Sequence, residues 1–386
     1  MAGRVSEERM DISLSEEQEL LQQSARDFLQ QECPIRLVRA MEEDERGYDP
    51  HLWKQMGDLG WLGLVFPEEY GGSGLTMMDM AVLLEEFGRA LVPGPFVPTV
   101  IQAGLPILWA GSDGQKRELL PKIAQGEVIA TMAWHEPSAT SLPSGVEATA
   151  TRQGDTYLLN GTKLWVPFAH IADYLIVVAR TGAGGTPSDG ITLFLVDAKS
   201  PGLTVTKLRT VADDHQCEVL LQEVRAPQSQ ILGEVGKGWP VVEQVRDYGA
   251  VAMCAQMVGI AHQAFEISLN YAKTRVQFGR PIGSFQAIKH KLANMVIDVD
   301  GSRYVTYRAA WALSEGLPAA REIAVAKAWT NEACRRVVRE AQQVHGGIGY
   351  TKEYDLQLYT RRAKAAEIAF DDSDTHREAV ATCLDL

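Results

Sequence analysis

The residues best placed to hold a charged ligand lie between Tyr271 and Gln286, in the stretch YAKTRVQFGRPIGSFQ. A helical pattern ends there in a turn with Gly and Pro, and another helical pattern follows at once. The start of a helix leaves backbone N–H groups without partners, and Arg275 adds a positive charge beside them. Such a turn could hold a diphosphate by charge-assisted hydrogen bonds, although an ordinary corner between two helices would have the same spacing.

A second segment, Gln343 to Tyr350 (QVHGGIGY), contains three glycines within four positions after a long helical pattern. Glycine permits left-handed backbone and lets a ligand approach the chain closely. The end of a helix explains one of these glycines but not three. The segment does not follow a predicted strand, so it is not the dinucleotide-binding fingerprint of a Rossmann fold.

The overall charge argues against a nucleic-acid partner. The chain has 37 basic and 50 acidic residues and a net charge of −13, whereas binding to a phosphate backbone needs a basic surface. A phosphate-bearing ligand therefore requires locally placed arginines. The cysteines form no CxxC pair and no His lies at metal-ligand spacing, which predicts buried, reduced thiols and no metal site at Cys33, Cys217, Cys254, Cys334 and Cys383.

The N-terminal segment Met1 to Glu19 is acidic. It lacks both the apolar stretch of a signal peptide and the arginine-rich composition of a transit peptide, so we expect a cytoplasmic protein. No apolar run approaches the roughly 20 residues of a membrane-spanning helix, which predicts no membrane span.

The elements that must position these segments follow from length and periodicity. A chain of 386 residues exceeds the usual span of one hydrophobic core, so we expect two or three structural units. Helical periodicity covers Ser15–Gln31, where Ser15 and Gln18 could form a capping box. It continues in Leu52–Leu59, Met78–Ala90 and Gln115–Gly126.

The pattern changes twice along the chain. Short runs rich in β-branched residues between about Val128 and Leu232 predict a small antiparallel sheet. Long helical stretches then predict a bundle that also carries subunit contacts: Val241–Thr274, Phe285–Ser314 and Pro318–Val344. The expected fold class is α+β, with an all-helical domain at 1–127, an antiparallel β domain at 128–234 and a helical bundle at 235–386.

In this order, these segments resemble the acyl-CoA dehydrogenase family over nearly the whole chain. The matching motifs are the PEEYGGSG loop at Pro67–Gly74, the NGTKLW strand at Asn160–Trp165, Arg275-x-x-Phe278-Gly279, Phe285-Gln286 and Gln343-x-x-Gly346-Gly347. The resemblance implies a helical–sheet–helical subunit, usually in a tetramer built from two dimers, with FAD lying across the dimer interface.

The resemblance also implies which residues contact the cofactor. The sheet domain holds the flavin ring of its own subunit, with Trp165 similar to the tryptophan that shields the ring. The turns described above reach the pyrophosphate and adenine half of a neighbour's FAD, which assigns to that half Arg275, Gln286, Gln343, Gly346 and Gly347. Phe278, in the first of these turns, is a further cofactor-binding candidate.

The chemistry implied is the 2,3-desaturation of an acyl-CoA thioester. A base removes the proton next to the carbonyl, a hydride passes to the flavin, and an acceptor such as an electron-transfer flavoprotein takes the electrons.

The sequence departs from the family at the base. The family's glutamate usually follows an arginine that aligns with Arg361, and the gapless match is Phe370, with Asp371 one residue later. Other members carry the glutamate on an earlier helix, where the match is Gly249. Asp247 lies two residues away, a rotation of about 200° along a helix, and would face away from that position. Asp371 and Asp247 are the remaining candidates.

The flavin-facing half departs as well. The family's Thr-Glu-Pro appears as His135-Glu136-Pro137, and its Trp-Ile-Thr/Ser appears as Trp165-Val166-Pro167. Both changes remove a hydroxyl. In the family the second hydroxyl donates to flavin N5, and Pro167 has neither a side-chain nor a backbone donor to replace it.

The turns that reach a neighbour's FAD are thus kept, while the subunit's own flavin pocket and base are altered. The leading hypothesis is one subunit of an α2β2 heterotetramer whose partner carries the base. It would act on a bulky or unusual acyl-CoA, such as one with a steroid side chain, an aromatic or a dicarboxylic acid. The alternatives are a self-sufficient homotetramer that uses Asp371 or Asp247, and a flavin monooxygenase or a scaffold on the same fold.

Overall fold

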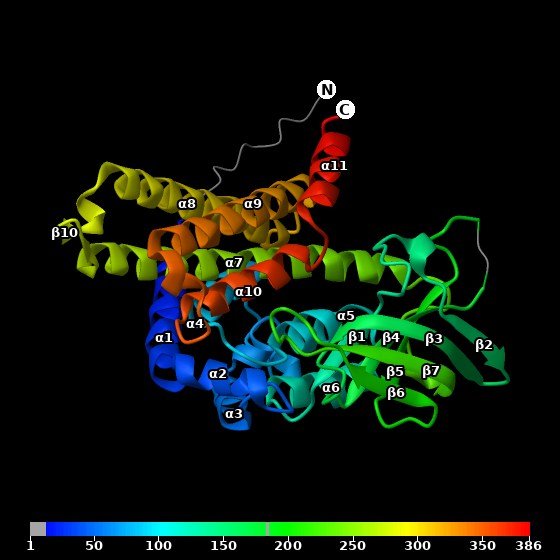
Figure 1. Cartoon of the computed structure of the whole chain (residues 1–386). Helices are drawn as coiled ribbons and strands as arrows, with labels where there is room; N and C mark the ends of the chain where they lie inside the picture. Colours follow the sequence, from blue (N-terminus) through cyan, green and yellow to red (C-terminus); the bar gives the residue numbers. More distant parts are fainter. Residues whose placement is uncertain (1–12, 183–184) are drawn as a thin grey trace.

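A computed structural model describes residues 13–182 and 185–386 and has three parts: a helical part, a sheet and a second helical part (Figure 1). This confirms the predicted α+β fold class. Most of the acidic N-terminal segment considered for a targeting signal, residues 1–12, lies outside the described residues. Among the described helices, none has both the length and the apolar character needed to cross a membrane.

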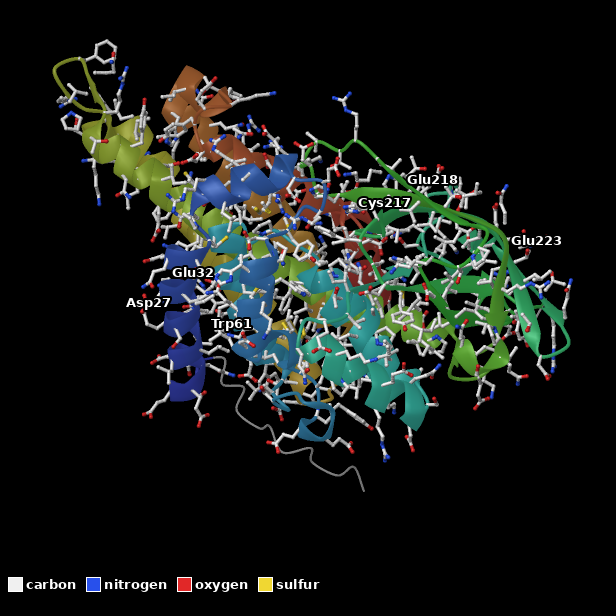
Figure 2. All side chains as sticks on the ribbon, turned by 90° about the horizontal axis from the view of Figure 1, so that it is seen from below. Asp27, Glu32, Trp61, Cys217, Glu218 and Glu223 are labelled. Carbon is white, nitrogen blue, oxygen red and sulfur yellow. The ribbon has the colours of Figure 1, made fainter. Side chains whose placement is uncertain are left out.

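The N-terminal part is helical throughout. Its first helix starts as predicted, because the Ser15 side chain accepts from the Gln18 N–H while the Gln18 side chain accepts from the Ser15 N–H. The elements are α1 (Glu16–Glu32), α2 (Ile35–Glu43), α3 (Pro50–Asp58), η1 (Trp61–Gly63), η2 (Glu68–Tyr70), α4 (Met77–Ala90), the π-helix η3 (Val97–Gly104), α5 (Leu105–Ala110) and α6 (Asp113–Ala124). In the view from below, Asp27 and Glu32 mark α1 and Trp61 marks η1 (Figure 2).

The sheet has eight strands in the order β6-β7-β3-β2-β4-β5-β8, with β1 also paired to β4. Its bounds are β1 (Ala130–Ala133), β2 (Thr149–Gln153), β3 (Thr156–Pro167), β4 (Tyr174–Arg180), β5 (Ile191–Asp197), β6 (Leu203–Lys207), β7 (Gln216–Pro227) and β8 (Ile231–Leu232), with η4 (Pro143–Gly145) and η5 (Gln228–Gln230) between them. Most of the strand pairs are antiparallel, as the sequence predicts, but β4 pairs in parallel with β1 and, at one position, with β2.

The C-terminal part is a bundle of long helices. It comprises α7 (Trp239–Thr274), a hairpin of β9 (Val276–Gln277) and β10 (Arg280–Pro281), η6 (Ile282–Ser284), α8 (Gln286–Ser314), α9 (Ala320–His345), η7 (Gly346–Tyr350), α10 (Leu356–Ile368) and α11 (Ser373–Cys383). Helix α7 runs the length of the molecule. The sheet lies toward one end of α7 and the β9–β10 hairpin at the other (Figure 1).

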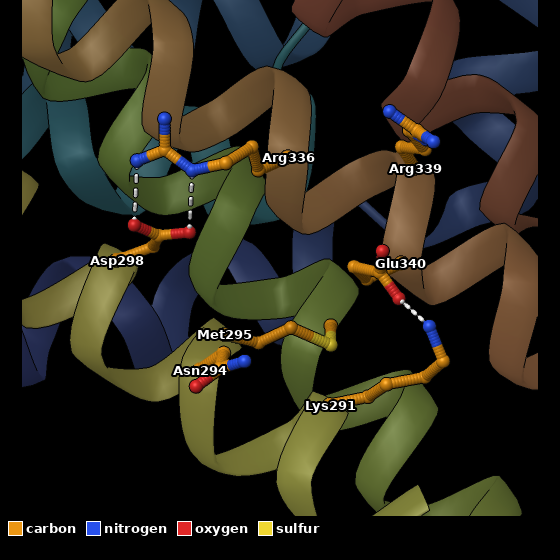
Figure 3. Close-up of a pocket in the computed structure, with 7 residues that line it drawn as sticks. All are labelled: Lys291, Asn294, Met295, Asp298, Arg336, Arg339 and Glu340. Carbon is orange, nitrogen blue, oxygen red and sulfur yellow. Dashed lines mark hydrogen bonds and ion pairs between the residues drawn. The ribbon is translucent and has the colours of Figure 1, made fainter. Parts of the chain in front are cut away.

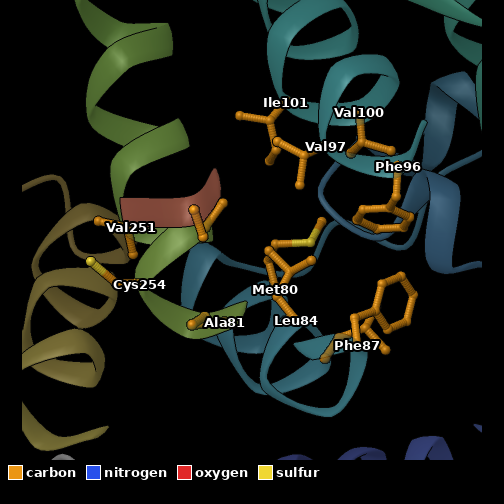
Figure 4. Close-up of a cluster of buried hydrophobic side chains, with 14 of the residues drawn as sticks. Met80, Ala81, Leu84, Phe87, Phe96, Val97, Val100, Ile101, Val251 and Cys254 are labelled. Atoms are coloured by element: carbon orange, nitrogen blue, oxygen red, sulfur yellow. The ribbon is translucent and has the colours of Figure 1, made fainter. Parts of the chain in front are cut away.

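Close backbone contact fixes α7 against α4. A Cβ atom on Gly88 would lie 1.9 Å from the Gln256 carbonyl oxygen, and one on Gly259 would lie 1.9 Å from the Glu85 carbonyl oxygen. Only glycine allows the two helices to approach this closely. Apolar side chains of α4, η3 and α7, including Met80, fill the adjoining core (Figure 4). The two ends of α7, where the sequence places its candidate site residues, are thereby held on a rigid support.

The cysteine prediction needs one correction. Cys33, Cys217, Cys254 and Cys334 are buried free thiols as expected, but Cys383 is exposed at the end of the last helix.

Candidate active site and cofactor surface

The hairpin after α7 projects an aromatic side chain into solvent. Arg275 is the C-cap of α7, and Gln286 is the first residue of α8. Phe278, at the tip between them, has a φ of 51° and is 92% exposed. The Arg280 guanidinium lies 4.2 Å above the ring of Phe285, which stiffens the base of the hairpin. The Phe278 ring is therefore free to contact another molecule.

The glycine turn after α9 is open to solvent. Gly346 has φ 65° and ψ −142°, a backbone conformation that side chains other than glycine rarely adopt. A Cβ on Gly346 or on Gly347 would meet no other described atom within 4 Å. Gln343, three residues earlier on α9, is exposed as well. This stretch of bare backbone can therefore be approached closely by a ligand.

An aromatic stack brings the two turns together. The ring of Tyr271, four residues before Arg275, stacks on His345, directly before Gly346, at 4.3 Å between centroids. His345 Nδ1 donates to the Ala341 carbonyl at 2.7 Å, and burial lowers the pKa of this histidine. The structure thus joins two segments that the sequence places about 70 residues apart.

A pocket of about 240 Å³ lies between α8 and α9 (Figure 3). Two ion pairs cross it, Lys291 with Glu340 and Arg336 with Asp298. Its remaining lining residues are Asn294, Met295 and Arg339. Arg339 lies one helical turn before Gln343, so it extends the polar surface of the glycine turn. Sequence reasoning missed this pocket, because no motif marks residues that meet only through helix packing.

These surfaces suit the half of FAD that the resemblance assigns to them. A diphosphate and an adenine need positive charge, N–H donors and acceptors. The exposed guanidinium of Arg275, the amides of Gln286 and Gln343 and the backbone at Gly346 offer these groups.

The flavin side of the subunit centres on Trp165, which is 45% exposed. It lies where the pairing of β3 with β7 shifts between Lys163 and Val166, a bulge that gives Trp165 a φ of 51° and turns its side chain outward. The His135 ring lies 6.5 Å from the Trp165 ring. Desolvation lowers the pKa of His135 to about 4, so its imidazole is neutral at physiological pH.

A buried ion pair lies behind the strand that carries Trp165. Lys163 Nζ lies 2.6 Å from Glu136 Oε1, and both side chains are buried. The Glu136 carboxylate also accepts from the backbone N–H groups of Glu147 and Ala148. Desolvation lowers the pKa of Lys163, and the Glu136 carboxylate opposes that shift. The pair joins the end of β1 to β3 and to the chain entering β2, a role that the sequence did not reveal.

The two positions at which the family carries its base meet in space. A Cβ on Gly249 of α7 would lie 2.2 Å from a ring carbon of Phe370, so the phenyl ring packs directly on the glycine. Phe370 is only 7% exposed. An apolar ring therefore lies at both positions at which the resemblance places the base.

The two candidate aspartates are separated from that place in different ways. Asp371 Oδ2 accepts from Arg246 Nη2 at 2.6 Å, and although burial opposes ionisation, the Arg246 charge holds the pKa of Asp371 below its usual value. Asp247 is exposed on α7 while Gly249 is buried, in agreement with the rotation predicted for two residues along a helix. Crowding by nearby protein atoms still desolvates the Asp247 carboxylate and raises its pKa to about 6.

Comparison with known proteins assigns the chain to a family. Family models for the N-terminal, middle and C-terminal domains of acyl-CoA dehydrogenase match residues 15–127, 131–224 and 236–384. A probable acyl-CoA dehydrogenase, YngJ of Bacillus subtilis, is 36% identical over 378 residues, which cover 96% of this chain and 99% of the relative.

Two solved structures are similar over almost their whole length. Butyryl-CoA dehydrogenase from Megasphaera elsdenii is 31% identical, with a TM-score of 0.89 and coverage of 98% of this chain and 100% of that one. A chain of the ChsE4-ChsE5 complex from Mycobacterium tuberculosis is 28% identical, with a TM-score of 0.88 and coverage of 97% and 99%. This chain therefore belongs to the acyl-CoA dehydrogenase family, a family of FAD-binding oxidoreductases.

Proposed function

We propose that this chain is one subunit of a heteromeric acyl-CoA dehydrogenase in which a partner subunit carries the base. The chain contributes the contacts that cross the interface to FAD, through Arg275, Phe278, Gln286, Gln343 and the Gly346–Gly347 turn. The reaction is the 2,3-desaturation of an acyl-CoA thioester, with an acceptor such as an electron-transfer flavoprotein. FAD, when bound, supplies the hydride acceptor.

The observation that carries this proposal is the contact of Phe370 with Gly249. Abstraction of the proton next to a thioester carbonyl needs a basic group within hydrogen-bond reach of that carbon. Here an aromatic ring and a glycine occupy both positions from which the family's glutamate acts. On the flavin side, His135 and Pro167 stand where the family has hydroxyl groups. The similarity to a chain of the ChsE4-ChsE5 complex agrees with a heteromeric assembly.

One observation favours a second function, a self-sufficient dehydrogenase that uses Asp247. A carboxylate with a pKa of about 6 is a better base at neutral pH than an ordinary aspartate. In that case Asp247→Ala would lower the rate by about 10²- to 10⁴-fold, the usual cost of losing a general base. Asp371, whose carboxylate is neutralised by Arg246, has no comparable support.

The deciding experiment measures FAD content and subunit composition of the purified chain. We expect little FAD in the chain expressed alone. We expect one FAD for each pair of unlike subunits when the chain is co-expressed with an acyl-CoA dehydrogenase homologue encoded next to it. Stoichiometric FAD and turnover in the lone chain would refute the partner-subunit proposal.

A further inference from the structure

Polar side chains gather between Trp165 and the turn that carries Phe370. His135 Nε2, beside Trp165, lies 3.3 Å from Ser141 Oγ. Although burial opposes the shift, the Ser141 hydroxyl helps to lower the pKa of Asp371, and the Asp371 carboxylate pairs with Arg246 of α7. These contacts join the loop after β1, the turn after α10 and helix α7.

The turn that carries Phe370 and Asp371 is held in an unusual conformation. Both residues are left-handed, with φ values of 54° and 74°. Non-glycine residues rarely adopt this region, so other contacts must hold it. His376 Nε2 donates to the Phe370 carbonyl at 2.9 Å. The turn is thus locked from one side by α11 and from the other by Arg246.

The end of α10, just before this turn, is fixed as well. The fully buried Lys327 ammonium of α9 donates to the Ala366 carbonyl at 2.8 Å. The side-chain amide of Asn331 donates to the Glu367 carbonyl at 3.0 Å. These bonds satisfy carbonyls that the last turn of a helix leaves without partners. The position of the Phe370 ring is therefore set by the interior of the bundle.

The chemistry of the family reaction shows what these contacts obstruct. The carbon that loses its proton must face the base, and the carbon that gives up the hydride must face the flavin. The acyl chain therefore lies between the two. In this subunit, the Asp371–Arg246 pair and the buried Phe370 ring lie where the resemblance places the base.

We propose that Phe370, Asp371, Arg246 and Ser141 form a clasp that closes this subunit's own acyl-binding space, so that the subunit does not take up an acyl-CoA chain. The inference rests on the proposed function and deepens it. The chain then serves the partner's site only, and its own pocket is occupied by its own side chains.

The test compares the binding of CoA with that of S-hexyl-CoA, a thioether that cannot be enolised, by calorimetry on the full chain. For the natural sequence, we expect the hexyl chain to add no affinity, since it has no space to enter. The double substitution Phe370→Ala with Asp371→Gly opens the clasp. Glycine at position 371 keeps the turn, because it readily adopts the φ of 74° found there. Each buried methylene adds about fourfold in affinity, so the opened variant should bind S-hexyl-CoA at least about tenfold more tightly than CoA.

Controls keep this test decisive. Ile368→Ala, two residues before Phe370 but 63% exposed, should leave the ratio of the two affinities unchanged. If the double variant does not fold, Arg246→Ala removes the clasp from the α7 side. Tighter binding of S-hexyl-CoA by the natural chain, or no gain in a folded opened variant, would overturn the clasp.

The FAD measurement separates the two proposals. A lone chain with stoichiometric FAD and no preference for S-hexyl-CoA keeps the clasp and refutes the partner-subunit role. A lone chain with little FAD and a clear preference for S-hexyl-CoA refutes the clasp and keeps the partner-subunit role.

Discussion

Phe370 and Gly249 lie in direct contact although they belong to different helical segments. A Cβ on Gly249 would lie 2.2 to 2.6 Å from three ring carbons of Phe370. These are the two positions at which the resemblance places the family's base, so a carboxylate on either segment would lie in the same place. In this chain the Phe370 ring occupies that place.

The first prediction concerns the fit of these two residues. Gly249→Ala should lower the free energy of unfolding by about 1 to 3 kcal/mol, because the added methyl overlaps the Phe370 ring. Phe370→Ala in the same chain should remove that clash, so the loss in the double variant should be smaller than the sum of the two single losses. Urea denaturation of the four proteins measures this coupling.

Gly114→Ala is the matched control, because its new methyl would touch only the Ser112 hydroxyl oxygen at 3.9 Å. It should cause no loss of stability. Additive losses at positions 249 and 370 would contradict the contact described here.

The second prediction concerns pH and His135. Its folded pKa of about 4 lies below the unfolded value of about 6.5, so the unfolded chain binds a proton that the folded chain does not. The contribution of neutral His135 to the free energy of unfolding is fully present above about pH 6.5 and is lost as the pH falls toward 4. The loss should reach at most about 3 kcal/mol.

Replacing the imidazole isolates this contribution from other titrating groups. The free energy of unfolding of the His135→Asn variant should fall less steeply than that of the natural chain between pH 6.5 and 4. Denaturant unfolding at several pH values measures both. Parallel curves for the two proteins would show that His135 titrates normally.

Much of the fold could be predicted from local sequence patterns. The capping box at Ser15 and Gln18 set the start of α1, and β-branched runs marked β3, β4 and β5. The parallel pairing of β1 was not readable, because this four-residue strand is buried on both faces and shows no alternation. The division into 1–127, 128–234 and 235–386 stays a prediction.

The residues of the candidate site could be predicted only in part, for a related reason. Motifs marked Arg275 and Gly346, because glycine and charge leave local signals, whereas Trp165 was singled out only by the resemblance to the family. Arg246 and Asp371 form an ion pair although they lie 125 positions apart, and no local pattern encodes such a meeting. The assignment of the cofactor-binding residues stays a prediction until it is tested.

The third prediction concerns the buried pair of Lys163 and Glu136. Lys163→Met leaves the Glu136 carboxylate buried without its counter-charge, which should cost about 3 to 5 kcal/mol. Lys237→Met breaks the exposed pair with Glu234 and should cause a much smaller loss of stability, because solvent screens that pair. Chemical denaturation compares the two, and similar losses would show that the Lys163 pair is not desolvated.

The last prediction concerns the glycine turn that faces the proposed interface. Gly346→Ala should reduce the FAD content of the complex formed with a partner subunit, because a methyl group stands on backbone that the cofactor must approach. Gly316→Ala is a control at a similar φ of 64°, where a Cβ would also meet no described atom within 4 Å. Both variants should lose some stability, because a side chain is strained at a positive φ. Only Gly346→Ala should lose FAD, measured as flavin absorbance per subunit after gel filtration. Equal FAD in the two complexes would place the cofactor away from this turn.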